Sequence, residues 1–362
     1  MVCVSHALMN RFKVLRGSRR LLASWLCIGL CGLFVACGRE PDFVERTVRV
    51  MEEPVTVRLP FRHRDEMDRV VTILEQLHRR YAPLIDVYDA HSEIARANQV
   101  GSVSRFPISR DTSRLLHYAR QLAANTDGNF DVTDAALRQL WWHHWRQSPD
   151  EPMPDAIIRA TLRGVGYQHL DVNEFTLLLA KPETQLNVND FARPFLLDLA
   201  MVKLRERGVG HVMIHSADFG RVFGVAKNRQ AWSIPLTHPQ SDAKLGRLEL
   251  PAQMAYARVG WPHHFFEFEG TSRSRIINPR TGRPAGGGEA VIVIGPVTAD
   301  AYALAHACFV LGLEESRSLL ARYERFHAIF ISREADATIH LSPALEPHFH
   351  PEREMARSVQ RL

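Results

Sequence analysis

The stretch Tyr88-Asp-Ala-His-Ser-Glu-Ile-Ala-Arg-Ala-Asn98 is the most informative part of this 362-residue chain. Two later blocks accompany it, Thr126-Asp-Gly-Asn-Phe-Asp-Val-Thr133 and Asn278-Pro-Arg-Thr-Gly-Arg-Pro284. In the first block an aromatic ring can stack on a planar ligand, and serine and asparagine side chains can hydrogen-bond its polar edge. In the second, Gly128 permits a positive φ, so that the backbone can turn close to a ligand.

Each block also has a plain structural interpretation. Ser92 can cap a short helix that Asn98 ends, and residues 126–133 can form a tight turn into a helix capped by Asp or Thr. These interpretations explain the residues one by one. They do not explain why the three blocks occur together and in this order.

Taken together, the three blocks resemble the ApbE-type FAD:protein FMN transferase family, and the resemblance covers roughly residues 45–345. It implies an α+β fold, a single ApbE-like domain of mixed sheets with packed helices. It also implies an enzyme that splits FAD in the presence of Mg²⁺ and attaches FMN to a Thr or Ser hydroxyl of a target flavoprotein.

The resemblance carries site residues with it. It implies that a flavin or its phosphates contact Tyr88, Asn129, Phe130, Asp131, Asn187, Arg193 and Arg275. It implies a metal at the positions of Asp190, Tyr302 and His306. No catalytic side chain is assigned.

The phosphate side of the family pattern is altered. Where the family has Asp-Leu-Gly-Gly-Ile-Ala-Lys-Gly-Tyr-x-x-Asp, this chain has the segment 187–198, in which Arg193 keeps a cation at the Lys position and Pro194 removes an N–H donor. Ser216-Ala-Asp218 replaces Gly-Gly-Asp, and its Cβ atoms narrow the approach to a pyrophosphate. Arg275 replaces a His, and Asn278 replaces the Asp of the third block.

The metal side is altered more. Where the family has Asp-Ala-Leu-Ala-Thr-Ala, this chain has Tyr302-Ala-Leu-Ala-His-Ala307, so Tyr302 replaces Asp and His306 replaces Thr. Mg²⁺ prefers anionic oxygen ligands, whereas a phenol is neutral at pH 7 and an imidazole suits zinc, copper, nickel or iron. Asp300 precedes Tyr302 by two residues and so faces away from the matching helix face. The sequence predicts that the Mg²⁺ site is lost.

Three functions therefore stay open. The first is a working transferase with Mg²⁺ or a substitute ion held by Asp190, Asp300 and His306. The second is a non-catalytic relative that binds FAD or a partner flavoprotein. The third is a different metal site built on His306 and nearby histidines. The pairs His143-His144 and His263-His264 do not favour it, because adjacent side chains point in different directions, and an aromatic wall or partner surface is preferred.

The composition and the N-terminal segment limit the expected location and partners of the protein. Residues 1–36 carry five Lys or Arg and no acid, which leaves 40 basic against 40 acidic residues and argues against a nucleic-acid partner. A basic start followed by the apolar run 21–36 predicts a lipoprotein-type signal peptide over residues 1–37, lipidated at Cys37. The alternative is a plain membrane anchor. We expect export and lipid anchoring to a bacterial membrane, facing the periplasm or cell exterior, with an exported or membrane flavoprotein as acceptor.

The expected domain bounds, helices and strands follow from hydrophobic periodicity and from the positions of Gly and Pro. Residues 38–62 are expected to be a linker, 63–345 the folded domain and 346–362 a polar tail. Cys308, in an apolar run, is expected to be inert core packing. The patterns predict helices over 67–81 (ending before Pro83), 111–125, 155–164, 195–207 and 299–311, and strands over 175–180, 211–214, 219–225, 265–268, 291–294 and 328–331.

Overall fold

The structure of this chain is a computed structural model. It describes residues 42–148, 150–241, 243–268, 271–286 and 288–362. The expected signal peptide and Cys37 lie outside the described residues and stay predictions. Among the helices that the structure describes, none is long and apolar enough to cross a membrane.

A nine-stranded mixed sheet forms the centre of the fold. Its neighbouring strands are antiparallel except for the last two, which run parallel. In spatial order the strands are β1 (Phe43–Val50), β2 (Glu53–Pro60), β6 (Val212–His215), β7 (Phe219–Phe223), β10 (Ala255–Val259), β13 (Glu289–Gly295), β14 (His327–Ser332), β15 (Ile339–Leu341) and β17 (Val359–Arg361).

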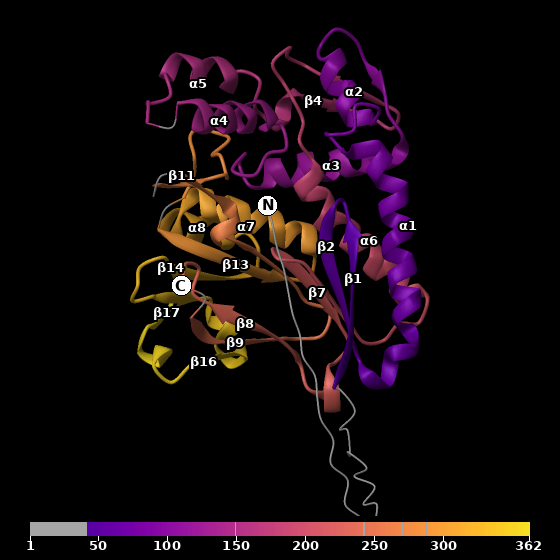
Figure 1. Cartoon of the computed structure of the whole chain (residues 1–362), viewed down its shortest axis with the longest axis vertical. Coiled ribbons are helices and arrows are strands. Elements are labelled where there is room, and N and C mark those ends of the chain that lie inside the picture. The colour runs from indigo at the N-terminus through magenta and orange to yellow at the C-terminus, as the bar shows by residue number, and fades with distance from the viewer. Residues whose placement is uncertain (1–41, 149, 242, 269–270, 287) are drawn as a thin grey trace, which may run out of the picture. The chain divides into compact units, whose positions relative to one another are not determined.

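Both faces of this sheet are buried. Successive side chains of a strand point to opposite sides, so each strand contributes to a core on either face. In β13, Val291 and Val293 join the core beneath the helices, whereas Ile292 and Ile294 join a second core on the other face. The helices that pack on the first side are α1 (Met67–Ile85), α6 (Asn189–Glu206) and α7 (Thr298–Leu311) (Figure 1). The other side is covered by the small sheet β16 (Phe349–Pro351), β9 (Lys244–Leu250) and β8 (Trp232–Thr237).

The other elements surround this centre. The remaining helices are α2 (Glu93–Val100), α3 (Arg110–Asn125), α4 (Ala135–Gln147), α5 (Asp155–Leu162) and α8 (Leu313–Leu320). The remaining strands are β3 (Phe106–Pro107), β5 (Thr176–Leu179) and β4 (Leu170–Val172) in one sheet, and β11 (Phe265–Phe268) and β12 (Thr271–Ser274) in another. The expected α+β class is confirmed, and the helices and strands predicted from residue 67 onward are all present, most within a few residues of their expected bounds.

The linker expected over residues 38–62 is wrong from residue 43 onward. β1 and β2 form an antiparallel hairpin at the edge of the central sheet, joined by the two-residue turn Met51-Glu52 with φ of +52° and +63°. Two-residue hairpin turns of this kind usually contain Asn-Gly or Asp-Gly, because two positive φ angles are costly for other residues. Met51 and Glu52 are not typical turn residues, so the sequence did not predict the hairpin.

The polar tail expected over residues 346–362 is also wrong. β16 pairs with β9, β17 pairs with β15, and Phe349 is buried in the second core. Two helix bounds differ as well. α1 continues through Pro83 to Ile85, and α6 begins at Asn189 rather than Phe195, with Pro194 inside it. Each proline costs one backbone hydrogen bond but does not end its helix, because tertiary packing holds the remaining turns.

Candidate functional site

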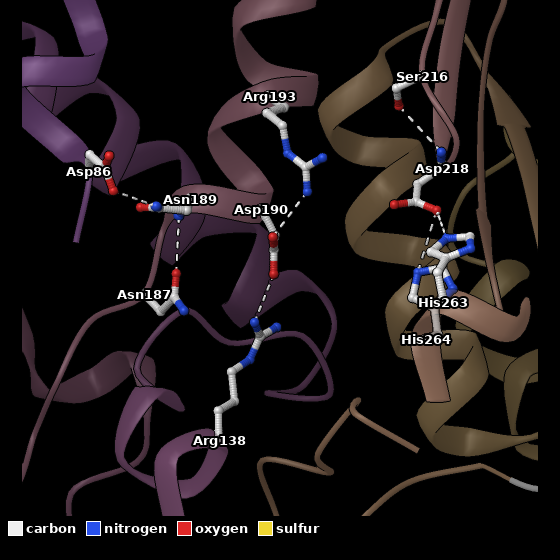
Figure 2. A network of polar contacts seen from close by, with 10 residues as sticks. All are labelled: Asp86, Arg138, Asn187, Asn189, Asp190, Arg193, Ser216, Asp218, His263 and His264. Atoms are coloured by element: carbon white, nitrogen blue, oxygen red, sulfur yellow. Dashed lines mark hydrogen bonds and ion pairs between the residues drawn. The ribbon is translucent and has the colours of Figure 1, made fainter. Parts of the chain in front are cut away.

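The first turn of α6 is held in place by asparagine side chains. Asn189 Nδ2 donates to Asp86 Oδ1 at 2.8 Å, and its Oδ1 accepts from the Val87 backbone N–H at 3.1 Å. Asn187 Oδ1 in turn accepts from the Asn189 backbone N–H at 3.2 Å (Figure 2). The start of α6 is therefore fixed to the end of α1, and the next residue, Asp190, has a defined position.

Asp190 lies between two arginines (Figure 2). Arg138 Nη1 donates to Asp190 Oδ2 at 2.7 Å, and Arg193 Nη2 donates to Asp190 Oδ1 at 3.0 Å. Burial alone would raise the pKa of Asp190, but the two guanidinium charges outweigh burial and hold that pKa far below its usual range. Because 42% of the side chain remains accessible, solvent screens part of these interactions. The carboxylate and both cations are already engaged with one another.

A small cavity opens beside Asp190. Its walls come from the loop before α4, from the start of α6, from α7 and from the segment 276–279. The lining residues are Asn129, Phe130, Asp131, Val132, Asp134, Arg138, Asn187, Asp190, Phe191, Ile276, Ile277, Pro279, Tyr302 and His306. Of the expected flavin contacts, Asn129, Phe130, Asp131 and Asn187 therefore meet at one place, together with all three expected metal positions.

Asp131 organises the loop that forms one wall. Its Oδ1 accepts from the Thr133 backbone N–H at 2.9 Å and from the Thr133 hydroxyl at 2.7 Å, and its Oδ2 accepts from the Tyr167 N–H at 2.6 Å. Burial raises the pKa of Asp131 to about 6, although these hydrogen bonds oppose the shift. Both carboxylate oxygens of Asp131 are therefore used to hold its own loop, and only their remaining lone pairs are available to a ligand.

This raised pKa predicts a pH effect on stability. Between its usual value of 3.8 and about 6 the folded state binds the Asp131 proton more tightly than the unfolded state. The contribution of this carboxyl group to stability therefore falls as the pH rises through that window. Relative to wild type, Asp131→Asn is expected to gain roughly 2 kcal/mol between pH 4 and pH 6.5. Denaturant unfolding of both proteins across this range measures the slope. A constant difference between them would show that the Asp131 pKa is unshifted.

Tyr302 and His306 occupy one face of α7 against the cavity, with ring centroids 4.3 Å apart. Burial raises the pKa of Tyr302 well above its usual value and lowers the pKa of His306 to about 3, so both are neutral at pH 7. His306 Nε2 is buried without a hydrogen-bond partner among the described residues. A neutral phenol and a neutral imidazole do not suit Mg²⁺, and the nearby Asp190 carboxylate is taken by two arginines. The residues present do not fit Mg²⁺.

Asp300 does not rescue the site. Its carboxylate accepts a hydrogen bond from the Tyr118 hydroxyl of α3, and it does not line the cavity. The prediction that Asp300 faces away from Tyr302 and His306 is confirmed.

Three expected flavin contacts, Tyr88, Arg193 and Arg275, do not line the cavity. The Tyr88 side chain is 84% exposed and does not line the cavity, and Arg193 is engaged by Asp190. Arg275 Nε donates to the Phe265 carbonyl at 3.1 Å. In the first block the structural interpretation applies to Ser92, whose Oγ accepts from the Ala95 N–H as the cap of α2.

Asn98 has a different partner from the one expected. Rather than ending α2, its side chain bonds both the N–H and the carbonyl of Leu186, at 2.8 and 3.0 Å. The first block thus holds the chain just ahead of Asn187 in place.

The third block is a turn that an aromatic cluster supports. Asn278 Oδ1 accepts from the Arg280 N–H at 2.8 Å, and Trp141 Nε1 donates to the Gly282 carbonyl at 2.7 Å. Trp145 stacks on Phe266 with centroids 5.7 Å apart. The aromatic wall expected for the Trp and His run of residues 141–145 is confirmed, and this wall positions the segment 276–279.

Sequence reasoning missed Arg138 and did not predict the arrangement of one histidine pair. Asp134 and Arg138, four apart on a helix face, were the only local signal for Arg138, and its reach to Asp190 depends on the fold. His263 and His264 both turn toward Asp218, because they lie in a tight 3₁₀ turn rather than on a regular helix or strand.

Comparison with known proteins agrees with this architecture. The model of the ApbE family matches residues 51–330. The chain belongs to the ApbE family. Its relatives include the FAD:protein FMN transferase of Vibrio cholerae serotype O1, 27% identical over 256 residues that cover 70% of this chain and 75% of the relative. The FAD:protein FMN transferase of Klebsiella pneumoniae is 27% identical over 268 residues, 72% of this chain and 81% of the relative.

Solved structures of the family superpose on the chain. The apo form of Pseudomonas stutzeri flavinyl transferase ApbE matches with a TM-score of 0.71 and 26% identity, covering 85% of this chain and 96% of that one. The ApbE protein of Thermotoga maritima matches with a TM-score of 0.72 at 19% identity, covering 84% and 99%, which shows a shared fold.

Proposed function

We propose that this protein binds FAD in the cavity between the 129–134 loop and the start of α6, and that it does not cleave FAD with Mg²⁺. The observation that carries the second part is the pair Tyr302 and His306, buried and neutral at the positions where the family holds its metal. The flavin part is supported by family membership and by the convergence of Asn129, Asp131 and Asn187 on one cavity.

The cavity suits a flavin in its chemistry. It combines apolar walls with a few polar groups that can fix the orientation of a ligand. Phe130 and Phe191 supply aromatic surface, while Asn129 and Asn187 supply amide groups that can pair with ring or ribose atoms. Bound FAD would bring an isoalloxazine ring and a pyrophosphate, and among the lining residues the Arg or Lys side chain available to the pyrophosphate is Arg138.

A second candidate is a working FMN transferase, which the curated relatives favour by their names. It would require an ion other than Mg²⁺, or a different arrangement around Asp190. In that case the acceptor would be an exported or membrane flavoprotein. We place either function outside the cytoplasm, on a lipid anchor at Cys37, on the strength of the predicted signal peptide alone.

Filling the cavity tests the binding site. Asn187→Trp, at a half-buried lining position, is expected to weaken FAD binding at least tenfold, because the indole would occupy the ligand volume. Gln185→Trp is the matched control, since Gln185 is also half-buried on the same segment but does not line the cavity. Quenching of flavin fluorescence measures both affinities. Equal affinities for the two variants would place the flavin elsewhere.

A further inference from the structure

We propose that Asp218, His263 and His264 form a binding site for a divalent transition metal of the zinc class. None of the three lines the cavity assigned to FAD, so this inference does not depend on flavin binding.

The three side chains come from two neighbouring turns. Asp218 sits in the turn between β6 and β7, where the Ser216 hydroxyl accepts from its backbone N–H at 3.3 Å. His263 and His264 lie in the 3₁₀ turn Pro262–His264 that follows β10. Figure 2 shows both imidazoles directed at the Asp218 carboxylate. Two loops that the central sheet brings together therefore present two nitrogen ligands and one oxygen ligand.

The spacing matches that of metal ligands. One ligand atom from each residue lies within 4.8 Å of the other two, and His264 Nε2 is 3.6 Å from Asp218 Oδ1. Two atoms bound at about 2.0–2.1 Å to a tetrahedral Zn²⁺ lie about 3.3 Å apart, so small side-chain rotations suffice to close the site. Two imidazoles with one carboxylate suit zinc and its neighbours rather than Mg²⁺, and they leave a fourth position open.

The state of His264 argues against a cluster held by hydrogen bonds alone. His263 does hydrogen-bond Asp218 through Nε2, but the 3.6 Å separation from His264 is too long for a hydrogen bond. His264 is only 8% exposed, and its Nδ1 has no partner among the described residues. The ring nitrogen that faces Asp218 is Nε2, at a distance too long for a hydrogen bond. An ion bound between the two residues would engage this nitrogen together with the Asp218 carboxylate.

The surrounding charges limit the affinity. Arg258 donates through Nε to the Ala217 carbonyl, and its guanidinium lies 5.0 Å from the Trp261 ring centroid. Arg193 is also close enough to interact with Asp218, although Asp190 balances much of its charge. These cations oppose a bound cation, so we expect micromolar rather than nanomolar binding. The ion would lie near His306, whose ring centroid is 6.4 Å from that of His264.

Cobalt spectroscopy tests the site directly. The full chain in detergent, stripped with a chelator, is titrated with Co²⁺, whose visible absorption reports nitrogen and oxygen ligands in a low-coordinate geometry. We expect one Co²⁺ per chain, displacement of the visible bands by one equivalent of Zn²⁺, and no response to Mg²⁺. Because no flavin is present, the result is independent of whether the protein binds FAD.

Variants identify the ligands. His264→Gln and His263→Gln are each expected to weaken Co²⁺ binding at least tenfold. The second is the safer substitution, because the His263 side chain is 43% exposed and its loss leaves no internal void. His143→Gln, in the other adjacent histidine pair, is the matched control and should bind like wild type. Absence of visible bands in the wild type, or wild-type binding by a folded His263→Gln variant, would overturn the proposal.

Discussion

Replacing Asp198 by alanine is expected to lower the free energy of unfolding by about 3 kcal/mol. Asp198 projects from α6 to the start of α7. Its Oδ1 accepts from the Thr298 N–H at 2.9 Å and hydroxyl at 2.7 Å, and its Oδ2 accepts from the Ala299 N–H at 2.9 Å. It also pairs with Arg221.

The size of this effect has a specific physical cause. The residue before α7, Val297, cannot cap the helix with its side chain, so Asp198 supplies the cap from a different helix. Its loss would leave helix N–H groups unsatisfied and Arg221, only 18% exposed, without its carboxylate. Because α7 carries Tyr302 and His306, the cavity wall would loosen as well.

Thermal unfolding followed by circular dichroism measures the loss. Asp68→Ala is the matched control, because Asp68 is 86% exposed in the first turn of α1 and its pair with Arg46 is a surface ion pair. Such pairs contribute less than about 1 kcal/mol. If Asp198→Ala unfolded at the same temperature as Asp68→Ala, the cap assigned to Asp198 would have no energetic weight.

Restoring the family residues at the metal positions is expected to create activity. The double variant Tyr302→Asp with His306→Thr should release AMP from FAD in a Mg²⁺-dependent manner, at least tenfold above wild type. The carboxylate and hydroxyl oxygens, four residues apart on one face of α7, are the hard ligands that Mg²⁺ prefers. The new carboxylate would lie near Asp190, which opposes its ionised form, and near Arg193 and Arg138, which favour it.

The double substitution also removes buried packing, and a control variant must distinguish this loss of stability from the effect on metal binding. Tyr302 is 4% exposed and makes edge contacts with Phe130 and Phe219 at centroid distances of 6.3 and 6.5 Å. The matched control Tyr302→Asn with His306→Thr has nearly the same shape without the negative charge. Equal, Mg²⁺-independent AMP release by both folded double variants would show that position 302 does not hold the metal.

The fold could be predicted largely because three short blocks and several strongly periodic segments agree with one architecture. The continuous apolar run of β13 and the apolar run ended by Gly312 in α7 were visible in the sequence. The hairpin β1–β2 was not visible, since Met51 and Glu52 adopt positive φ without a turn residue. β17 has only three residues, and its parallel pairing with β15 leaves no local pattern in the sequence.

The candidate site was predictable in its membership but not in its internal bonding. Side chains at Asn129, Asp131 and Asn187 do meet, yet sequence could not show that Asp131 is used by its own loop. Arg138 and Asp190 are 52 residues apart, so their ion pair depends on the fold that brings α4 near the start of α6. Sequence position alone likewise could not place His263 and His264 on the same carboxylate.

Titration of the wild-type full chain with FAD, with and without Mg²⁺, followed by flavin fluorescence and AMP release, tests the proposed function most directly. Binding of FAD without AMP release, unchanged by Mg²⁺, is the predicted result. Mg²⁺-dependent release of AMP would contradict it and show that Tyr302 and His306 do not block the metal. Absence of FAD binding would also contradict it and move the function to protein partners.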